Sequence, residues 1–237
     1  MRRYFLNFND DDKDLFIGGS DFHHIKNVLR LNLGDKLEVV SYDKLFTCQI
    51  DEFLEDKVKL TILEKKNLTN KKLKIRLFQA LAKGEKLDFI CQKATELGAD
   101  EIIIFESSRT VVKLDKKRLE KKLERLNKIT IEASKQCKRN KIPLVKGGID
   151  IKEIEGENLF CFYENSKKSL KDFLYNKNFT EINIIIGPEG GFSEEEIEIL
   201  RSKGAEILSL GPRILRTETA GLAAIAISQY ELGDMGE

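Results

Sequence analysis

Two Gly-Pro segments near the C-terminus combine the residue types and spacing of a ligand-binding crevice. The first is INIIIGPEGG at 182–191, and the second is EILSLGPRILRTETAG at 206–221. Each is an apolar run typical of a strand, followed by Gly-Pro and by a loop that opens a helix. Rigid loops at the carboxyl ends of successive strands form the ligand crevice of an open α/β sheet. Chemistry is therefore expected within residues 187–218.

The first loop contains glycines that permit close approach of the backbone to a ligand. Gly190 and Gly191 lie in GPEGG, which lacks the GxGxxG spacing, and the chain has no GK[ST] sequence. A nucleoside triphosphate site or a conventional dinucleotide site is therefore weakly supported. For this motif taken alone, a plain tight turn is the alternative interpretation.

The second loop favours a ligand site over a plain tight turn. Ile214 and Leu215 lie between Arg213 and Arg216 in GPRILRTET. Apolar loop residues are expected to line something, such as the face of a flat ligand ring. Glu218 lies at the start of the following helix, where a negative charge is also favourable for purely structural reasons.

The charge distribution indicates a polyanionic partner. The net charge of the chain is only +1, yet residues 109–146 hold 14 Lys and Arg against 4 Asp and Glu. A run of one sign lacks the internal ion pairs of an ordinary solvated helix, which is the alternative interpretation. Such a patch is typical of nucleic-acid binding.

Composition excludes several other classes of protein. No apolar stretch approaches the length of a membrane span, and the N-terminus MRRYFLNFNDDD lacks the apolar core of a signal peptide. Four widely spaced cysteines and two histidines make a zinc site or a disulfide framework unlikely in 237 residues. A cytoplasmic protein with reduced thiols and no bound metal is expected.

The first 70 residues are predicted to form a small β-rich unit resembling a barrel. Ser20 is expected to cap a short helix, and residues 65–72 form the best candidate for a linker. The strands are expected at 4–7, 15–18, 36–42, 45–53 and 57–64.

From residue 73 onward, strands and helices are predicted to alternate. Ser193 and Glu196 form a capping box at a helix start, and Gly204 marks its end. The near-continuous apolar strands indicate a parallel sheet covered on both faces. Strands are expected at 74–81, 101–107, 158–164, 182–188 and 206–212, with helices at 83–97 and 114–138.

The last predicted helix, at about 217–232, is apolar or small almost all round. Such a helix is either buried within its own domain or packed against a partner.

Several segments together resemble a known family. LGPRILRTETA and IGPEGGFSEEE resemble the signature motifs of the small-subunit ribosomal RNA uridine-N3 methyltransferases, the RsmE type of the SPOUT superfamily. HHIKNVLR with LGD nearby, KGEKLDFICQKATELGA and EASKQCKRNKIP agree in the same order.

The resemblance implies an α/β fold with two domains. Residues 1–70 would form a small PUA-like RNA-binding β-barrel. Residues 73–237 would form a SPOUT domain with a parallel sheet and a trefoil knot, the knot lying at about 182–221. The implied cofactor is S-adenosylmethionine, and the implied assembly is a homodimer whose knotted regions pack together. The implied partner is 16S rRNA or the small ribosomal subunit.

The expected site residues follow from the matching motifs and, for RNA, from the distribution of basic residues. Arg216 is expected to stabilise an anionic uridine, with Glu218 or Glu189 as possible bases, although a structural role is an equal alternative for each. The residues expected to bind the cofactor are Ile186, Gly187, Pro188, Glu189, Gly190, Gly191, Leu210, Gly211, Ile214, Leu215 and Thr217. Those expected to contact RNA phosphates are Arg2, Arg3, Arg30, Lys116, Lys117, Lys121, Lys122 and Arg139.

Two other classes of function are alternatives. A non-catalytic RNA-binding factor in ribosome assembly would keep the same fold without binding the cofactor. An oxidoreductase that binds a dinucleotide is disfavoured, because the GxGxxG fingerprint and its downstream acidic residue are missing.

Overall fold

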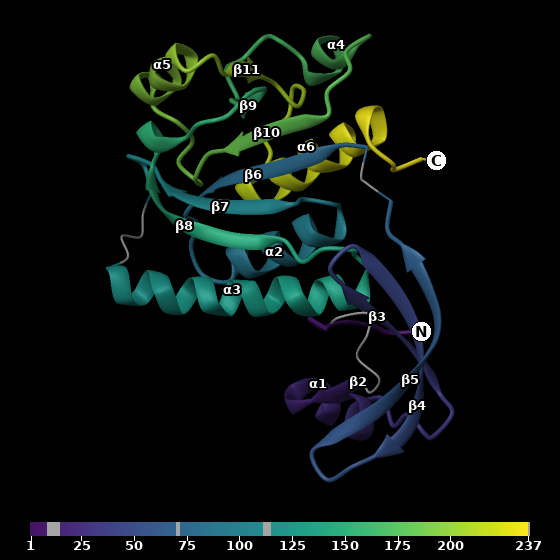
Figure 1. Cartoon of the computed structure of the whole chain (residues 1–237). Helices are drawn as coiled ribbons and strands as arrows, with labels where there is room; N and C mark the ends of the chain where they lie inside the picture. Colours follow the sequence, from purple (N-terminus) through teal and green to yellow (C-terminus); the bar gives the residue numbers. More distant parts are fainter. Residues whose placement is uncertain (9–14, 70–71, 111–114, 237) are drawn as a thin grey trace. The chain divides into compact units, whose positions relative to one another are not determined.

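The computed structural model in Figure 1 describes residues 1–8, 15–69, 72–110 and 115–236. The chain divides into two compact units. One comprises Met1–Asn70 with Ser134–Asn140, and the other comprises Lys71–Ala133 with Lys141–Glu237. The predicted helix start at Leu114 and part of the predicted linker lie outside the described residues.

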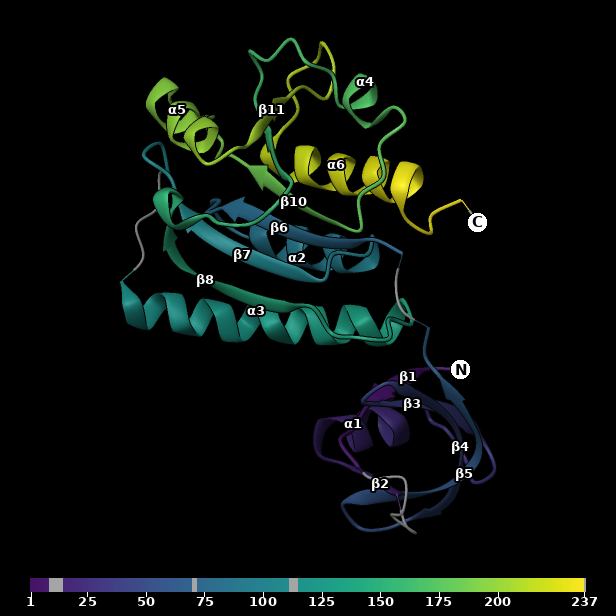
Figure 2. The ribbon, with the colours of Figure 1, turned by 45° about the horizontal axis from the view of Figure 1, so that its top comes forward.

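The described part of the first unit contains one five-stranded sheet in the order β1-β3-β4-β5-β2. β1 runs parallel to β3, and the other pairs are antiparallel. Register shifts between β4 and β5 accompany a curl of the sheet, which Figure 2 shows. Among the described strands β1 and β2 remain as edges, so the predicted barrel is a half-barrel. The strands are β1 Arg3–Phe5, β2 Leu15–Gly18, β3 Lys36–Ser41, β4 Lys44–Phe53 and β5 Lys57–Asn67.

One local prediction for this unit is wrong, and a second holds only in part, since the boundary between the units after Asn70 lies within the predicted linker. The helix α1, Gly19–His23, follows β2 directly with Gly18 as its N-cap and no side-chain cap, so Ser20 lies inside the helix. A π-helical turn, η1 at His24–Val28, continues it. Strand β5 extends to Asn67 through part of the predicted linker, because residues 65–67 pair with the start of β4.

The described part of the second unit contains a six-stranded sheet, parallel throughout, in the order β11-β9-β10-β6-β7-β8. The edge strand β8 was not predicted, since Gly147 and Gly148 interrupt its apolar pattern. The strands are β6 Lys74–Ala80, β7 Glu101–Glu106, β8 Leu144–Asp150, β9 Leu159–Phe162, β10 Glu181–Ile186 and β11 Glu206–Leu208.

Helices cover both faces of this sheet. They are α2 Lys86–Glu96, α3 Lys116–Gln136, α4 Leu170–Leu174, α5 Glu194–Ser202 and α6 Thr217–Leu232, with a 3-10 turn, η2, at Ile151–Glu153. Ile184 of β10 packs toward α2 and α6, which Figure 1 shows along one face. The adjacent Ile185 packs with residues of α5 and η2. The predicted parallel sheet, buried on both faces, is confirmed.

The predicted capping box at the start of α5 is also confirmed. Ser193 accepts a hydrogen bond from the backbone N–H of Glu196, whose carboxylate accepts one from the N–H of Ser193 at 2.9 Å. The second carboxylate oxygen of Glu196 accepts from the N–H of Ser108, which follows β7, at 2.8 Å. The start of α5 is therefore anchored to the loop that follows β7. Gly204 has φ +82° and ends this helical segment as predicted.

Helix α6 is covered on one side by its own domain. Ala224 and Ile225 are fully buried, and the helix contacts α2, β6 and β10. Ile227 and Tyr230 are 38% and 68% exposed on its other side. Among the described residues, no helix has both the length and the apolar character needed to span a membrane.

Candidate functional site

The carboxyl ends of the parallel strands β9, β10 and β11 meet at one edge of the sheet in the second unit. The loops after β9, β10 and β11 form two adjoining cavities of about 310 Å³ and about 400 Å³. The walls shared by both cavities are Phe162, Glu164, Ile214, Leu215 and Ala220. This is the edge at which an open α/β sheet binds ligands.

The predicted cofactor residues divide between these two cavities. The first is lined by Ile186, Gly187, Pro188, Glu189, Gly191, Ile214, Leu215 and Thr217 of the predicted set. The second is lined by Leu210, Gly211, Ile214 and Leu215. Gly190 is not among the lining residues of either cavity, and it packs instead beside Arg109, whose Cβ would lie 3.3 Å from a Cβ at position 190.

A chain of hydrogen bonds joins the two Gly-Pro loops below the cavities. Thr217 Oγ1 donates to the carbonyl oxygen of Gly187 at 2.7 Å. Gln79 Nε2, from the end of β6, donates to Thr217 Oγ1 at 2.9 Å. Gln79 is fully buried and Thr217 nearly so. Because these bonds are shielded from water, they fix the second loop against the first.

Two glycines of the first loop are required by close packing. A Cβ on Gly187 would lie 3.0 Å from the ring of Phe192. Gly191 has φ +67°, and a Cβ there would lie 2.8 Å from Glu164 Oε1. Larger residues at these positions would displace a wall of the first cavity.

Ile214 is the most exposed apolar side chain of the site. It is 86% exposed and lines both cavities. Exposing so much apolar surface is unfavourable unless a ligand covers it. The expectation from sequence that apolar loop residues line a crevice therefore agrees with the position of Ile214.

Three charged residues cluster at the first cavity. Lys86 Nζ lies 3.0 Å from Glu189 Oε1 and 3.5 Å from Glu218 Oε2. The backbone N–H of Lys83 also donates to Glu189 Oε1 at 3.1 Å. Arg216, at the N-cap of α6, is exposed and lines this cavity.

These contacts set the protonation of Glu189. Desolvation alone would raise the pKa of this carboxyl, but hydrogen bonds from Lys86 and from backbone amides outweigh it and lower the pKa. The hydrogen bond to Glu189 raises the pKa of Lys86. Both groups are therefore charged at neutral pH, and Glu189 is a weak base.

Sequence reasoning did not nominate Phe162, Glu164, Lys86 or Gln79 as site residues. Phe162 and Glu164 end the predicted strand at 158–164, and the rule that ligands bind at carboxyl ends of parallel strands would have identified them. Lys86 lies in the recognised segment KGEKLDFICQKATELGA, but no local signal directs its side chain to the loops.

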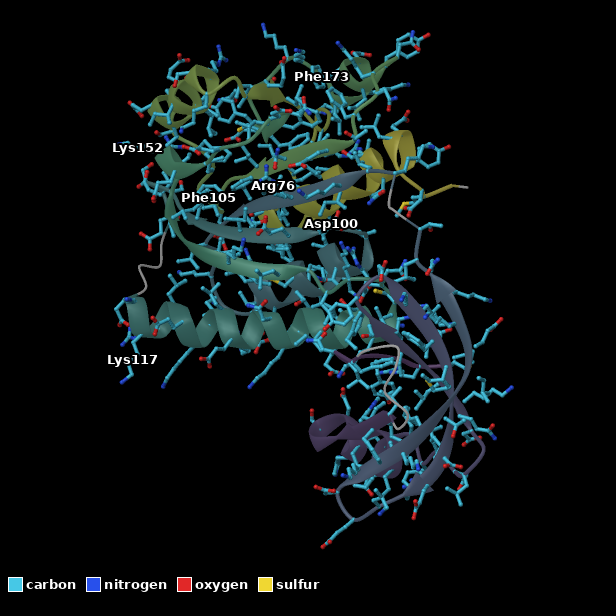
Figure 3. All side chains as sticks on the ribbon, viewed as in Figure 1. Arg76, Asp100, Phe105, Lys117, Lys152 and Phe173 are labelled. Carbon is cyan, nitrogen blue, oxygen red and sulfur yellow. The ribbon has the colours of Figure 1, made fainter. Side chains whose placement is uncertain are left out.

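The predicted RNA-binding residues differ in accessibility. Lys116, Lys117 and Lys121 of α3 are exposed, and Lys122 is half-buried. Figure 3 shows Lys117 pointing away from the sheet of its unit. Of the predicted residues outside this helix, Arg30 is exposed and Arg2 is half-buried. Arg3 and Arg139 are buried.

Arg3 is engaged by the protein. Its Nε donates to Glu38 Oε2 at 3.0 Å, and its guanidinium also donates to the carbonyl oxygen of Lys138 and to Asn140 Oδ1. A buried, fully paired guanidinium is unsuited to a phosphate contact in this conformation. The sequence-based expectation for Arg3 overlooked Glu38, which is 35 residues away in the chain.

Metal and thiol chemistry receive no support from the described residues. Among them, no group of three or more His, Cys, Asp or Glu is placed to hold a metal ion. Burial raises the pKa of Cys48 and of Cys91 to about 12, so neither thiol is a ready nucleophile at neutral pH.

Two family models match the chain. The family described as RNA methyltransferase domain matches residues 69–229. The family described as RNA methyltransferase PUA domain matches residues 17–63.

Individual relatives are similar over nearly the whole chain. Ribosomal RNA small subunit methyltransferase E of Bacillus subtilis is 36% identical and covers 98% of this chain and 97% of its own length. The protein of that name from Buchnera aphidicola is 34% identical, with coverage of 95% and 92%.

Solved structures extend the similarity to the fold. A ribosomal RNA small subunit methyltransferase E from Neisseria gonorrhoeae, bound to S-adenosylmethionine, superposes with a TM-score of 0.88 at 31% identity and 99% coverage of both chains. A Legionella pneumophila protein described as a putative methyltransferase with bound S-adenosylmethionine gives 0.88 at 32% identity and 98% coverage of both. The chain belongs to the ribosomal RNA small subunit methyltransferase E family of RNA methyltransferases.

Proposed function

We propose that this chain transfers a methyl group from S-adenosylmethionine to N3 of one uridine in 16S rRNA. The observation that carries the proposal is the crevice between the two Gly-Pro loops, joined through Thr217 and Gly187. Relatives with this fold are bound to S-adenosylmethionine. The choice of N3 of uridine rests on the resemblance of LGPRILRTETA and IGPEGGFSEEE to the uridine-N3 family.

The lining of the crevice suits this cofactor. Ile186, Leu215 and exposed Ile214 offer apolar contacts for a flat ring. Glu164, for which the described residues provide no hydrogen bond or ion pair, places a carboxylate beside a ligand that carries a positive sulfonium. Backbone groups of Gly187–Gly191 and Leu210–Leu215 would supply most of the polar contacts.

When bound, the cofactor supplies an electrophilic methyl group for an in-line displacement. The protein must hold the uridine in line and manage the proton that leaves N3. Arg216 lines the first cavity and stabilises the negative charge that develops on the uracil ring. Glu189 and Glu218 are the carboxylates available to accept the proton, and the hydrogen bond from Lys86 makes Glu189 a weak base. Charge stabilisation by Arg216 is therefore the larger contribution in this proposal.

We assign RNA binding to residues 1–70, as a PUA-like domain, and to the basic face of α3. In the second unit, Lys116, Lys117, Lys121 and Lys122 would contact phosphates, and in the first unit Arg30 and Arg2 would do so; such contacts position an RNA without reading its sequence. Arg3 and Arg139 are left out of this proposal, because both are buried.

We assign the remaining residues, 73–237, to a methyltransferase domain whose segment 182–221 forms a trefoil knot. After β11 at one edge of the sheet, the chain returns to pack α6 on β10 and β6. This return past β9 favours threading of the chain.

We also propose a cytoplasmic location, where the assembling small ribosomal subunit would be the partner.

The exposed side of α6 supports a homodimer. Ile227 and Tyr230 are exposed apolar residues on a helix whose other side is buried. A two-fold partner would cover them in a self-complementary interface. Because α6 begins at Thr217, the interface would lie beside the cofactor crevice.

The proposed reaction is tested by methyl transfer from labelled S-adenosylmethionine to 16S rRNA and to assembled small subunits, with mapping of the product by mass spectrometry. We expect one methylated uridine, modified at N3. Binding of the cofactor without methyl transfer to either substrate would favour the non-catalytic assembly factor.

The apolar wall of the crevice provides a first test by mutation. Ile214→Ser should weaken binding of S-adenosylmethionine about tenfold, as expected from losing about 1.5 kcal/mol of apolar burial. The free energy of unfolding should change little, because Ile214 is exposed in the free protein. Calorimetric titration measures both this variant and Leu144→Ser, a matched change at an exposed aliphatic residue of β8. Equal affinities of the two variants for S-adenosylmethionine would contradict a contact between Ile214 and the cofactor.

The basic face of α3 provides a second test. Reversing Lys116, Lys117, Lys121 and Lys122 together to Glu should weaken RNA binding and flatten its dependence on salt, since each lost phosphate contact reduces counterion release. Cofactor affinity should be unchanged. Reversal of Lys152, Lys171, Lys177 and Lys203 is the charge-matched control. If both variants lose RNA affinity equally, only net charge matters and the assignment to α3 fails.

The proposed dimer is tested at Ile227. Ile227→Asp places a charge on the exposed side of α6 and should convert dimers to monomers in sedimentation experiments, because burial of an unpaired charge in the interface is costly. Ala224 is unsuitable for this test, since it is buried in its own domain. A wild-type chain that sediments as a monomer yet methylates rRNA normally would contradict the dimer.

A further inference from the structure

Lys86 connects the two Gly-Pro loops from a third element, the first turn of α2. Its Nζ lies 3.0 Å from Glu189 in the first loop and 3.5 Å from Glu218, just after the second. The backbone N–H of Lys83, just before α2, donates to the same Glu189 oxygen. Lys86 itself lines the first cavity. Lys86 thus adds an ionic link between the two loops to the hydrogen bonds through Thr217.

The link to Glu218 is important because of where that carboxylate lies. Its Oε2 atom is buried, and no hydrogen bond from a described residue reaches it. The ion pair with Lys86 is the contact that balances its charge. A buried carboxylate oxygen that loses its charge partner would move toward solvent or repel Glu189. Either movement would shift the start of α6 relative to the first loop.

We infer that Lys86 is a positioning residue for cofactor binding, which holds Glu189 and Glu218 together and thereby sets the separation of the two loops. The inference rests on the proposed function, because the cavity that Lys86 lines is the proposed cofactor crevice. Lys86 acts through the two carboxylates and not by contact with the reacting atoms. Its side chain is one-third exposed.

Two features separate this role from general stabilisation of the fold. Lys93, on the same helix, forms an ion pair with Glu96 at 2.8 Å that touches neither loop. Loss of that pair removes one lysine and one ion pair from α2 without affecting the crevice. An arginine at position 86, by contrast, can span both carboxylates and should rescue the positioning role.

The experiment compares Lys86→Met, Lys86→Arg and Lys93→Met by calorimetric titration with S-adenosylmethionine and by thermal unfolding without it. Lys86→Met should weaken binding about fivefold, a modest effect because the ion pair is partly exposed. Lys86→Arg should retain most of the affinity, and Lys93→Met should bind as the wild type does. In methyl-transfer kinetics, Lys86→Met should raise KM for the cofactor more than it lowers kcat.

A double-mutant cycle tests whether Lys86 acts through Glu189. Adding Glu189→Gln to Lys86→Met should weaken binding no further, since the contact is already lost. If Lys86→Met lowers the thermal stability, the double variant Lys86→Met/Glu218→Gln removes the unpaired charge of Glu218. This double variant should regain thermal stability, while its affinity for S-adenosylmethionine stays low.

The outcomes separate this inference from the proposed function. If the wild-type chain does not bind S-adenosylmethionine, the proposed function itself fails. If the wild-type chain binds it and Lys86→Met binds equally well, the inference alone is overturned. Equal losses in Lys86→Met and Lys93→Met, or strictly additive effects in the cycle, would also overturn it.

Discussion

The architecture of the site depends on the hydroxyl group of Thr217. This group donates to the carbonyl oxygen of Gly187 and accepts from Gln79, so it joins β6, the loop after β10 and the start of α6. All three groups lie at the carboxyl edge of the parallel sheet, where water is excluded. Without this connection, the two Gly-Pro loops would lose the buried hydrogen bond that fixes their separation. The cavities above them would then lose a defined shape.

Contacts within the first loop also fix its shape. The ring of Phe192 packs against Gly187 and leaves no room for a side chain there. The capping box at Ser193 and the contact from Glu196 to Ser108 hold the far side of the first loop. Helix α6 begins at Thr217 and is buried against β10 and β6. The crevice is thus formed by rigid parts, with the exposed Ile214 left available for a ligand.

Features that depend on neighbouring residues in the chain were predictable from the sequence. Strand β10, the capping box and the helix end at Gly204 have local signals, and the structure confirms them. Features that depend on distant partners were not predictable. Lys86 and Gln79 reach the loops only because the sheet order places β6 beside β10. The expectation that Arg3 binds RNA failed for the same reason. Its partner Glu38 is distant in the sequence and can be recognised only in the folded chain.

The most direct test of this account is the affinity for S-adenosylmethionine of Thr217→Val and Thr217→Ser, measured by calorimetry. Valine keeps the shape of threonine but strands the carbonyl of Gly187 and removes one of the two acceptors of the Gln79 amide, which keeps its hydrogen bond to the carbonyl oxygen of Ala80, whereas serine keeps the hydroxyl. Because a stranded buried polar group costs about 1–3 kcal/mol, we expect Thr217→Val to bind at least about fivefold more weakly. Thr217→Ser should bind nearly as the wild type does. Wild-type affinity in Thr217→Val would contradict the claim that this hydroxyl group holds the crevice together.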